Sequence, residues 1–282
     1  MGRLFVVNSR GEKEPFSFQK ICRAAQKAGA PARVSREIAR SIEGEVYPLI
    51  TTLEISEMMR KLLQKEHPGA ALRFNIKEAM RRLGPTGFPF EKYAAEVLKS
   101  LGYRTKINQF IPGKCLGSYE IDFVAEKGNI IYIGECKYRN LFGERVDSPD
   151  ALENYARFLD ILNGPHFKSK KYRNFIIKTM MVTNTKFNER VVAYANCVGM
   201  ELLGWHYPRG RGLEYLIEKE KLYPITILPA LKGYLKEIFT QEKLMLAKDV
   251  LRIDSERFAR KFKISPAYLK PLINQAEILL KE

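Results

Sequence analysis

The sequence predicts an α/β domain in the middle of the chain, preceded by a mainly helical region and followed by a helical tail. Strand-like runs at 119–125, 130–138 and 175–183 alternate with stretches of helical periodicity, which is typical of α/β domains. Before residue 84, by contrast, apolar residues recur at spacings of three and four. We expect domains at 1–84, 85–207 and 208–282, with a linker at 208–212.

The composition is that of a folded globular protein. Hydrophobic residues make up 45% and charged residues 28% of the 282 residues. No apolar run approaches the ~20 residues that span a bilayer, and the apolar stretch near the N-terminus is too short for a signal peptide. The sequence therefore predicts a cytoplasmic protein without a membrane partner.

The charge balance is strongly basic. The chain carries 48 Lys and Arg against 32 Asp and Glu, a net charge of +16. Such an excess favours a polyanionic partner such as DNA, because phosphate contacts release condensed counterions. A basic protein without such a partner is the alternative. Four dispersed cysteines and three dispersed histidines favour neither a disulfide framework nor a zinc site.

Local signals define the elements of the first domain. The elements expected there include a strand at 4–7, a polar turn at 8–11 and helices at 35–46 and 70–83. Thr52 is the expected N-cap of a further helix. The run Gly84-Pro-Thr-Gly87 then marks the boundary, and a helix over 90–101 opens the second domain.

Two of the strand-like runs form a predicted β-hairpin around residues 127–128. Alternate residues of a strand share a face, so Glu135 and Lys137 point the same way. A loop of two or four residues would place Asp122 opposite Ile133, on that face and diagonal to Glu135. A loop of three or five residues would separate Asp122 from the others unless a bulge restored the parity.

Two carboxylates beside a lysine are suited to phosphodiester hydrolysis. Asp122 and Glu135 offer the hard oxygen ligands that Mg²⁺ prefers, and the metal polarises a phosphoryl group and lowers the pKa of a bound water. Lys137 can hold that water or offset charge on the phosphate. Glu91, near the start of a helix, is either a partner of the helix dipole or part of the site.

A solvated strand edge is the competing interpretation, because Glu-x-Lys is common there and an isolated Asp122 is most often a surface residue of a hairpin. Here, however, Glu135 and Lys137 end the apolar run 130–133, which is typical of a central strand. Unpaired charges are costly in such a strand, and this position favours a functional site.

The same residues resemble the signature of PD-(D/E)xK nucleases. Asp122 is followed, after twelve residues, by Glu135-x-Lys137. The run 87–103 resembles a helix of Mrr-like restriction endonucleases, and 182–199 resembles the last strand–helix–strand unit of that core. The resemblance covers the expected central domain and implies a mixed sheet flanked by helices.

This resemblance also implies a role for each site residue. Asp122 and Glu135 would bind Mg²⁺ or Mn²⁺, Lys137 would be catalytic, and Glu91 would be the carboxylate of the helix. The implied activity is that of a DNA endonuclease. Cutting both strands usually needs two active sites, so a homodimer is the corresponding expectation.

The first domain is similar to an ATP-cone, a small, mainly helical regulatory module that binds nucleotide. The similarity rests on residues 6–21 and 50–55. Asn8-Ser9 stands where that family usually has a Lys-Arg pair, and Arg10 is the substitute one position away. A helical domain without a ligand is the alternative. The residues that would surround ATP or dATP are Val6, Arg10, Glu14, Lys20 and Thr52.

Basic residues collect near a turn of the C-terminal tail. The tail resembles a helix-hairpin-helix module that binds the DNA backbone, although the hairpin glycines of that module are absent. A solvated helical pair that serves in packing or dimerisation is the alternative. The residues that would contact DNA are Arg252, Arg257, Arg260, Lys261 and Lys263.

The leading hypothesis is a metal-dependent DNA endonuclease regulated by ATP or dATP. One alternative is a catalytically inactive DNA-binding or regulatory protein on the same fold, and another is a nucleotide-sensing regulator. The intact set of Asp122, Glu135 and Lys137 favours the enzyme over the inactive protein.

Overall fold

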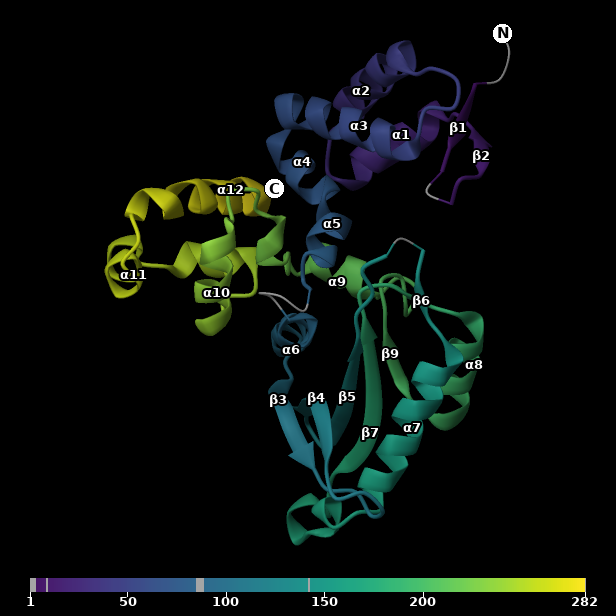
Figure 1. The fold of residues 1–282 in the computed structure, drawn as a ribbon, viewed down its shortest axis with the longest axis vertical. Helices are drawn as coiled ribbons and strands as arrows, with labels where there is room; N and C mark the ends of the chain where they lie inside the picture. Colours follow the sequence, from purple (N-terminus) through teal and green to yellow (C-terminus); the bar gives the residue numbers. More distant parts are fainter. Residues whose placement is uncertain (1–3, 9, 85–88, 142, 282) are drawn as a thin grey trace. The chain divides into compact units, whose positions relative to one another are not determined.

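The computed structural model describes residues 4–8, 10–84, 89–141 and 143–281 (Figure 1). The chain forms two compact units, and each unit combines distant parts of the sequence. The units are Met1–Met80, Ile225–Lys232 and Ala247–Glu282 for the first, and Arg81–Pro224 and Gly233–Leu246 for the second. The tail expected at 208–282 is thus divided between both units.

The first unit begins with a small β-hairpin. Its strands are β1 (Phe5–Val7) and β2 (Lys13–Pro15), which pair antiparallel. The side-chain oxygen of Asn8 accepts hydrogen bonds from the backbone N–H groups of Arg10 and Glu12, at 2.9 and 3.1 Å. The predicted strand and polar turn are confirmed, and Asn8 closes the turn.

Most of the remaining first unit is helical. Its helices are α1 (Phe18–Lys27), α2 (Ala32–Glu45), α3 (Thr52–Glu66), α4 (Pro68–Phe74), α5 (Ile76–Arg81), α11 (Ser255–Phe262) and α12 (Leu269–Lys281), with short 3-10 helices at Ile225–Ile227, Ala247–Arg252 and Pro266–Tyr268. Ile42 and Leu63 are fully buried in a shared apolar core. Arg73 joins distant segments, because its guanidinium donates to the carbonyl groups of Ala28 and Leu279, at 2.7 and 3.3 Å.

The structure corrects two predictions in this unit. Thr51, not Thr52, is the N-cap of α3, because its side chain accepts from the N–H of Glu54 while the Glu54 carboxylate accepts from the N–H of Thr51. This reciprocal pair is a capping box. The helix expected over 70–83 is two helices, since Asn75 leaves the helical conformation and its side chain bonds to a carbonyl of α4 at 3.0 Å.

The second unit is an α/β fold around a five-stranded mixed sheet (Figure 1). In spatial order the strands are β3 (Arg104–Ile111), β4 (Tyr119–Lys127), β5 (Ile130–Lys137), β7 (Ile176–Thr183) and β9 (Glu201–Leu203). Strand β4 pairs antiparallel with β3 and with β5, whereas β7 pairs parallel with β5 and with β9. The predicted α/β domain is confirmed, with β4, β5 and β7 at the three expected strand positions.

Helices flank this sheet, and a two-stranded parallel ladder lies beside it. The helices are α6 (Phe90–Ser100), α7 (Ser148–Leu162), α8 (Glu189–Val198), α9 (Leu213–Lys219) and α10 (Gly233–Gln241), and the ladder joins β6 (Arg145–Val146) to β8 (Lys186–Phe187). Phe158 and Ile161 of α7 share an apolar cluster with Ile133 of β5. The expected linker at 208–212 lies within this unit, directly before α9. Residues 85–87 of the expected boundary lie outside the described residues.

The hairpin between β4 and β5 has a two-residue turn, Gly128-Asn129, because Lys127 pairs with Ile130. Gly128 has a φ of +60°, a left-handed conformation that glycine adopts without a steric penalty. The predicted even-length turn is therefore confirmed, one residue later than expected.

The register of this hairpin places two site residues side by side. Its last regular pair is Phe123 with Gly134, so Asp122 and Glu135 are the residues adjoining this pair on their strands. The predicted pairing of Asp122 with Ile133 is wrong, because the turn lies one residue later. A Cβ atom at Gly134 would lie 2.1 Å from ring carbons of Phe123, so the close contact at this pair requires glycine.

In the described part of the chain, no helix is both long enough and apolar enough to cross a membrane.

Candidate active site

Glu135 lies near the end of β5 and is only 8% exposed. Arg157 of α7 contacts both of its carboxylate oxygens, with Nη1 2.8 Å from Oε2 and Nη2 3.4 Å from Oε1. Lys137 approaches from the same strand, with Nζ 2.9 Å from Oε1. These two cations offset the cost of removing the Glu135 charge from water.

Lys137 stands between two carboxylates. Its Nζ lies 2.9 Å from Oε1 of Glu135 and 3.7 Å from Oδ1 of Asp150, in the first turn of α7. Arg139 holds the other oxygen of Asp150 at 2.8 Å. Burial alone would lower the pKa of Lys137, but the hydrogen bond and charge of Glu135, together with the charge of Asp150, raise it above its ordinary value. Lys137 is therefore a cation at neutral pH.

Asp122 reaches from β4 to the backbone of β5. Its Oδ2 accepts a 2.6 Å hydrogen bond from the N–H of Cys136, the residue between Glu135 and Lys137. The ladder between β3 and β4 leaves Asp122 and Asn108 unpaired, and Asn108 has a φ of +51°. Such local interruptions of a ladder redirect side chains and are frequent beside active sites.

The carboxyl group of Asp122 lies in an acidic environment. Its pKa is raised to about 6, mainly because the group is partly buried. The hydrogen bond from Cys136 and the positive charge of Arg157 lower this pKa, and the negative charges of Glu135 and Glu91 raise it. Glu91 belongs to the first turn of α6. A cation among these groups would relieve their repulsion.

The structure brings the residues that were predicted for catalysis to one place. Asp122, near the start of β4, meets Glu135 and Lys137 at the end of β5, and the charge of Glu91 acts on Asp122. Sequence reasoning missed three charged residues of this place, which are Arg139, Asp150 and Arg157. The last two lie seven residues apart, a spacing that puts them on one face of a helix and was the available signal.

The donor set suits a weakly held divalent ion. Asp122 and Glu135 supply carboxylate oxygens, and in the described ranges no group of three or more His, Cys, Asp or Glu side chains is placed to hold a metal. Mg²⁺ retains several waters and commonly takes one or two protein carboxylates together with phosphate oxygens of the substrate. A pair of carboxylates is consistent with that mode of binding.

The residues predicted to surround a nucleotide lie around the N-terminal hairpin and two helix starts. Val6 is buried on β1, directly opposite Glu14 of β2. Glu14 forms a 3.1 Å ion pair with Lys20, near the start of α1. Thr52 opens α3, and a bridge joins β1 to the residue before it. Arg10 lies in the turn between the strands and is exposed.

The basic residues predicted to contact DNA lie on and around α11. Arg257, Arg260 and Lys261 belong to this helix, whereas Arg252 ends the preceding 3-10 helix and Lys263 follows α11 with a φ of +53°. All five side chains are exposed, so they are accessible to a polyanion. The helical character predicted for the tail is confirmed, and α12 is the longest of its helices.

The mixed five-stranded sheet with flanking helices defines an α/β protein whose charged cluster lies at the end of a hairpin. Residues 223–280 match the family described as AF1548-like, C-terminal. An Archaeoglobus fulgidus protein described as uncharacterized is 35% identical over 183 residues, which cover 65% of this chain and 97% of that protein. The crystal structure of the protein of unknown function AF1548 is 32% identical, with a TM-score of 0.58, over 68% of this chain and 98% of that one. The chain therefore belongs to the AF1548-like family.

Proposed function

We propose that the protein is a DNA endonuclease of the PD-(D/E)xK type, similar to Mrr-like enzymes, that depends on Mg²⁺ or Mn²⁺. The observation that carries this proposal is the hairpin register. The last regular pair adjoins Asp122 and Glu135, Asp122 accepts from the N–H of Cys136, and Lys137 lies 2.9 Å from Glu135 on the same strand. The spacing of these residues also resembles the nuclease signature.

Each residue of the cluster has a role in this proposal. Asp122 and Glu135 would hold the metal ion, which would polarise the phosphodiester and lower the pKa of a bound water. Lys137, charged at neutral pH, would stabilise the negative charge that grows on the phosphate. Arg157 would keep Glu135 in position, and Asp150 would do the same for Lys137.

The charge of the chain supports DNA as the substrate. The net charge of +16 favours binding to phosphates, and the exposed basic residues around α11 are suited to backbone contacts. Two copies of a chain with one active site would cut both strands, so the proposal includes a homodimer.

A cleavage assay tests the proposal directly. Single-stranded, duplex and branched DNA would be incubated with the protein and Mg²⁺ or Mn²⁺. We expect Asp122→Ala and Lys137→Ala each to reduce cleavage at least about 100-fold, because each removes a group that acts on the developing charge. Lys178→Gln, on β7, is the control and should retain activity. Undiminished cleavage by both active-site variants would reject the assignment.

A regulatory nucleotide site in the first unit is part of the same proposal. Lys20 is 64% exposed although it pairs with Glu14, so its ammonium group is accessible to a phosphate. We expect millimolar ATP or dATP to raise the melting temperature of the protein, and the rise to be lost in Lys20→Ala. No stabilisation of the native chain would reject nucleotide binding.

A catalytically inactive DNA-binding or regulatory protein is the second candidate. The observation that favours it is the pairing of Glu135 with Arg157 and Lys137, which satisfies this carboxylate without a metal. DNA binding without cleavage under every metal condition would support this candidate over the enzyme.

A further inference from the structure

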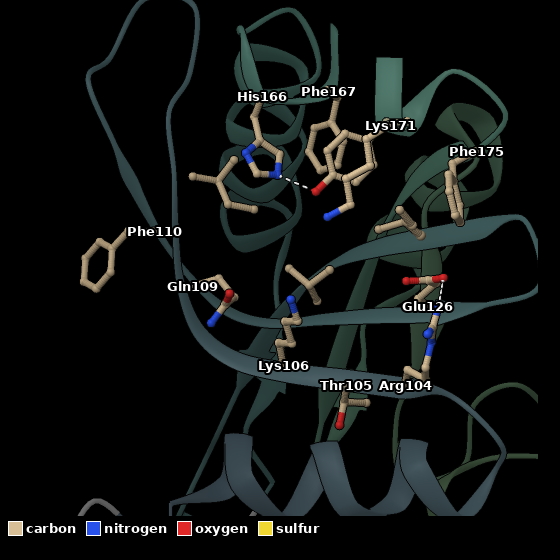
Figure 2. A pocket seen from close by; sticks show the side chains of 14 residues that line it. Arg104, Thr105, Lys106, Gln109, Phe110, Glu126, His166, Phe167, Lys171 and Phe175 are labelled. Carbon is tan, nitrogen blue, oxygen red and sulfur yellow. Dashed lines mark hydrogen bonds and ion pairs between the residues drawn. The ribbon is translucent and has the colours of Figure 1, made fainter. Parts of the chain in front are cut away.

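A cavity of the second unit lies beside β3, the edge strand of the sheet (Figure 2). Its volume is about 550 Å³, which is within the range of pockets that hold small molecules. Side chains of β3 and β4 line one wall. The segment 166–175, which follows α7, lines the other.

The second wall is a cluster of aromatic rings. The ring centroids of Phe167 and Tyr172 lie 4.9 Å apart at a steep angle, and those of Tyr172 and Phe175 lie 6.3 Å apart. The hydroxyl of Tyr172 is 3.1 Å from Nε2 of His166. These contacts hold the rings in fixed positions, and a preformed aromatic surface is what a nucleobase stacks on.

Two lysines reach the cavity from its two walls. Figure 2 shows the ammonium groups of Lys106, from β3, and Lys171, from the opposite segment, directed into the space between them. Neither has a carboxylate partner among the described residues. Glu126, the acidic residue of the lining, is paired with Arg104. The cavity therefore combines an apolar wall with positive charge that no neighbouring acid neutralises.

We propose that this cavity binds one unpaired nucleotide of a single-stranded nucleic acid. Its base would stack on the ring of Phe175, whose plane is inclined at 68° to that of Tyr172, and its phosphate would lie between Lys106 and Lys171. Phe110, 69% exposed, lies at one end of the cavity and apart from the ring cluster (Figure 2). An exposed ring there offers a stacking surface to a neighbouring base, which favours a strand over a free mononucleotide.

The cavity and the candidate active site share one face of the sheet. Ile131 lines the cavity, and Glu135 lies four residues further along β5, so their side chains point the same way. Four residues of strand span roughly 13 Å. Ile133, between the two positions on the same face, is buried against Phe158 and Ile161 of α7, so a bound strand would pass around this helix. Together with the proposed nuclease activity, the cavity implies that the substrate is single-stranded or locally unpaired DNA. This conclusion rests on the proposed function.

Binding can be measured without cleavage. A fluorescein-labelled dT15 oligonucleotide would be titrated with protein in EDTA, and its anisotropy recorded. We expect Lys106→Gln/Lys171→Gln to raise the Kd at least about tenfold, because the phosphate loses both of its cations. Lys178→Gln/Lys219→Gln removes the same number of charges outside the cavity and should change the Kd less than about twofold.

The aromatic wall has a separate readout. An oligonucleotide with 2-aminopurine in place of one base is quenched when that base stacks on a ring. We expect Phe175→Leu to reduce this quenching while the melting temperature of the protein stays unchanged. Equal affinity of the cavity variant and its charge-matched control would overturn the proposal. Competition by dTMP as effective as that by dT15 would also overturn it, in favour of a free nucleotide.

The two proposals fail in different ways. If Asp122→Ala and Lys137→Ala still cleave DNA, the endonuclease assignment fails, and oligonucleotide binding at the cavity is unaffected. If the cavity variant binds and cleaves single strands like its control, the cavity proposal fails, and the assignment of the active site remains.

Discussion

The backbone N–H of Cys136 donates a 2.6 Å hydrogen bond to Oδ2 of Asp122. Because Cys136 lies between Glu135 and Lys137, this contact fixes the carboxylate of one strand beside the Glu-x-Lys segment of the other. The partner of the Asp122 carboxylate in this contact is a backbone group and not a cation. Its charge is consequently only partly compensated, which leads to the first two predictions.

Asp122→Asn should stabilise the metal-free protein at neutral pH. The pKa of Asp122 is about 6 in the folded state against an ordinary value of 3.8. Between about pH 4 and pH 6 the folded form holds a proton that the unfolded form has lost, so stability decreases as pH rises through this window. Asparagine removes this cost and still accepts from Cys136. We expect a gain of about 1 to 2 kcal/mol at pH 7.5 and none at pH 4.

Urea unfolding in EDTA at the two pH values measures this gain. The difference between the variant and the native chain should grow from pH 4 to pH 7.5. A loss of stability of the same size at both pH values would show that the Asp122 charge is fully compensated in the folded protein.

Metal binding should compete with protonation of Asp122. At pH 7.5 the carboxylate is mostly ionised, and Mn²⁺ should raise the melting temperature. At pH 5.5 most molecules carry a proton on Asp122, so the shift should be smaller at the same metal concentration. Asp122→Asn should show little shift at either pH. An equal shift at both pH values in the native chain would exclude Asp122 as the ligand.

Arg157→Gln should destabilise the protein in the absence of metal. Glu135 is 8% exposed, and the substitution leaves Lys137 as its remaining cation, so we expect a loss of about 1 to 3 kcal/mol in the free energy of unfolding. Mn²⁺ should restore more stability in this variant than in the native chain, because an ion can take the place of the guanidinium. Glu153→Gln is the control: its exposed pair with Arg157 should contribute less than about 0.5 kcal/mol.

The N-cap of α3 can be tested with neighbouring threonines. Thr51→Ala removes the acceptor of the capping box and should reduce the free energy of unfolding by about 1 kcal/mol. Thr52→Ala, one residue later, should change it by only a few tenths of a kcal/mol. Thermal unfolding of the two variants distinguishes them, and a larger effect at Thr52 would contradict the assignment of the cap.

Much of the candidate site was predictable because it depends on local periodicity. Alternation along a strand puts Glu135 and Lys137 on one face. A two-residue turn that contains Gly128 puts Asp122 on the same face, whether Gly128 is its first or its second residue. The position of the turn was not predictable in the same way. Gly128 is compatible with a turn at Lys127-Gly128 and with one at Gly128-Asn129. The packing of Phe123 over Gly134 occurs only with the second turn.

The rest of the site depends on tertiary contacts. Arg157 and Asp150 act on β5 only because α7 packs beside it, and no spacing within the sequence relates Arg157 to Glu135. Strand β3 was also missed. As an edge strand it alternates charged or polar residues such as Lys106 with partly buried ones such as Ile107, and its apolar signal is weak.

The division of the chain into units affects how the protein can be cut. The chain passes from one unit to the other at 80/81, 224/225, 232/233 and 246/247. A fragment that ends near residue 84 lacks α12, whose carbonyl at Leu279 accepts from Arg73. A single protease cut at any of these crossings leaves the first unit assembled from two fragments, and a cut at 224/225 or 232/233 does the same to the second unit. The fragments should therefore migrate together until denaturant separates them, so truncation is a poor way to isolate either unit.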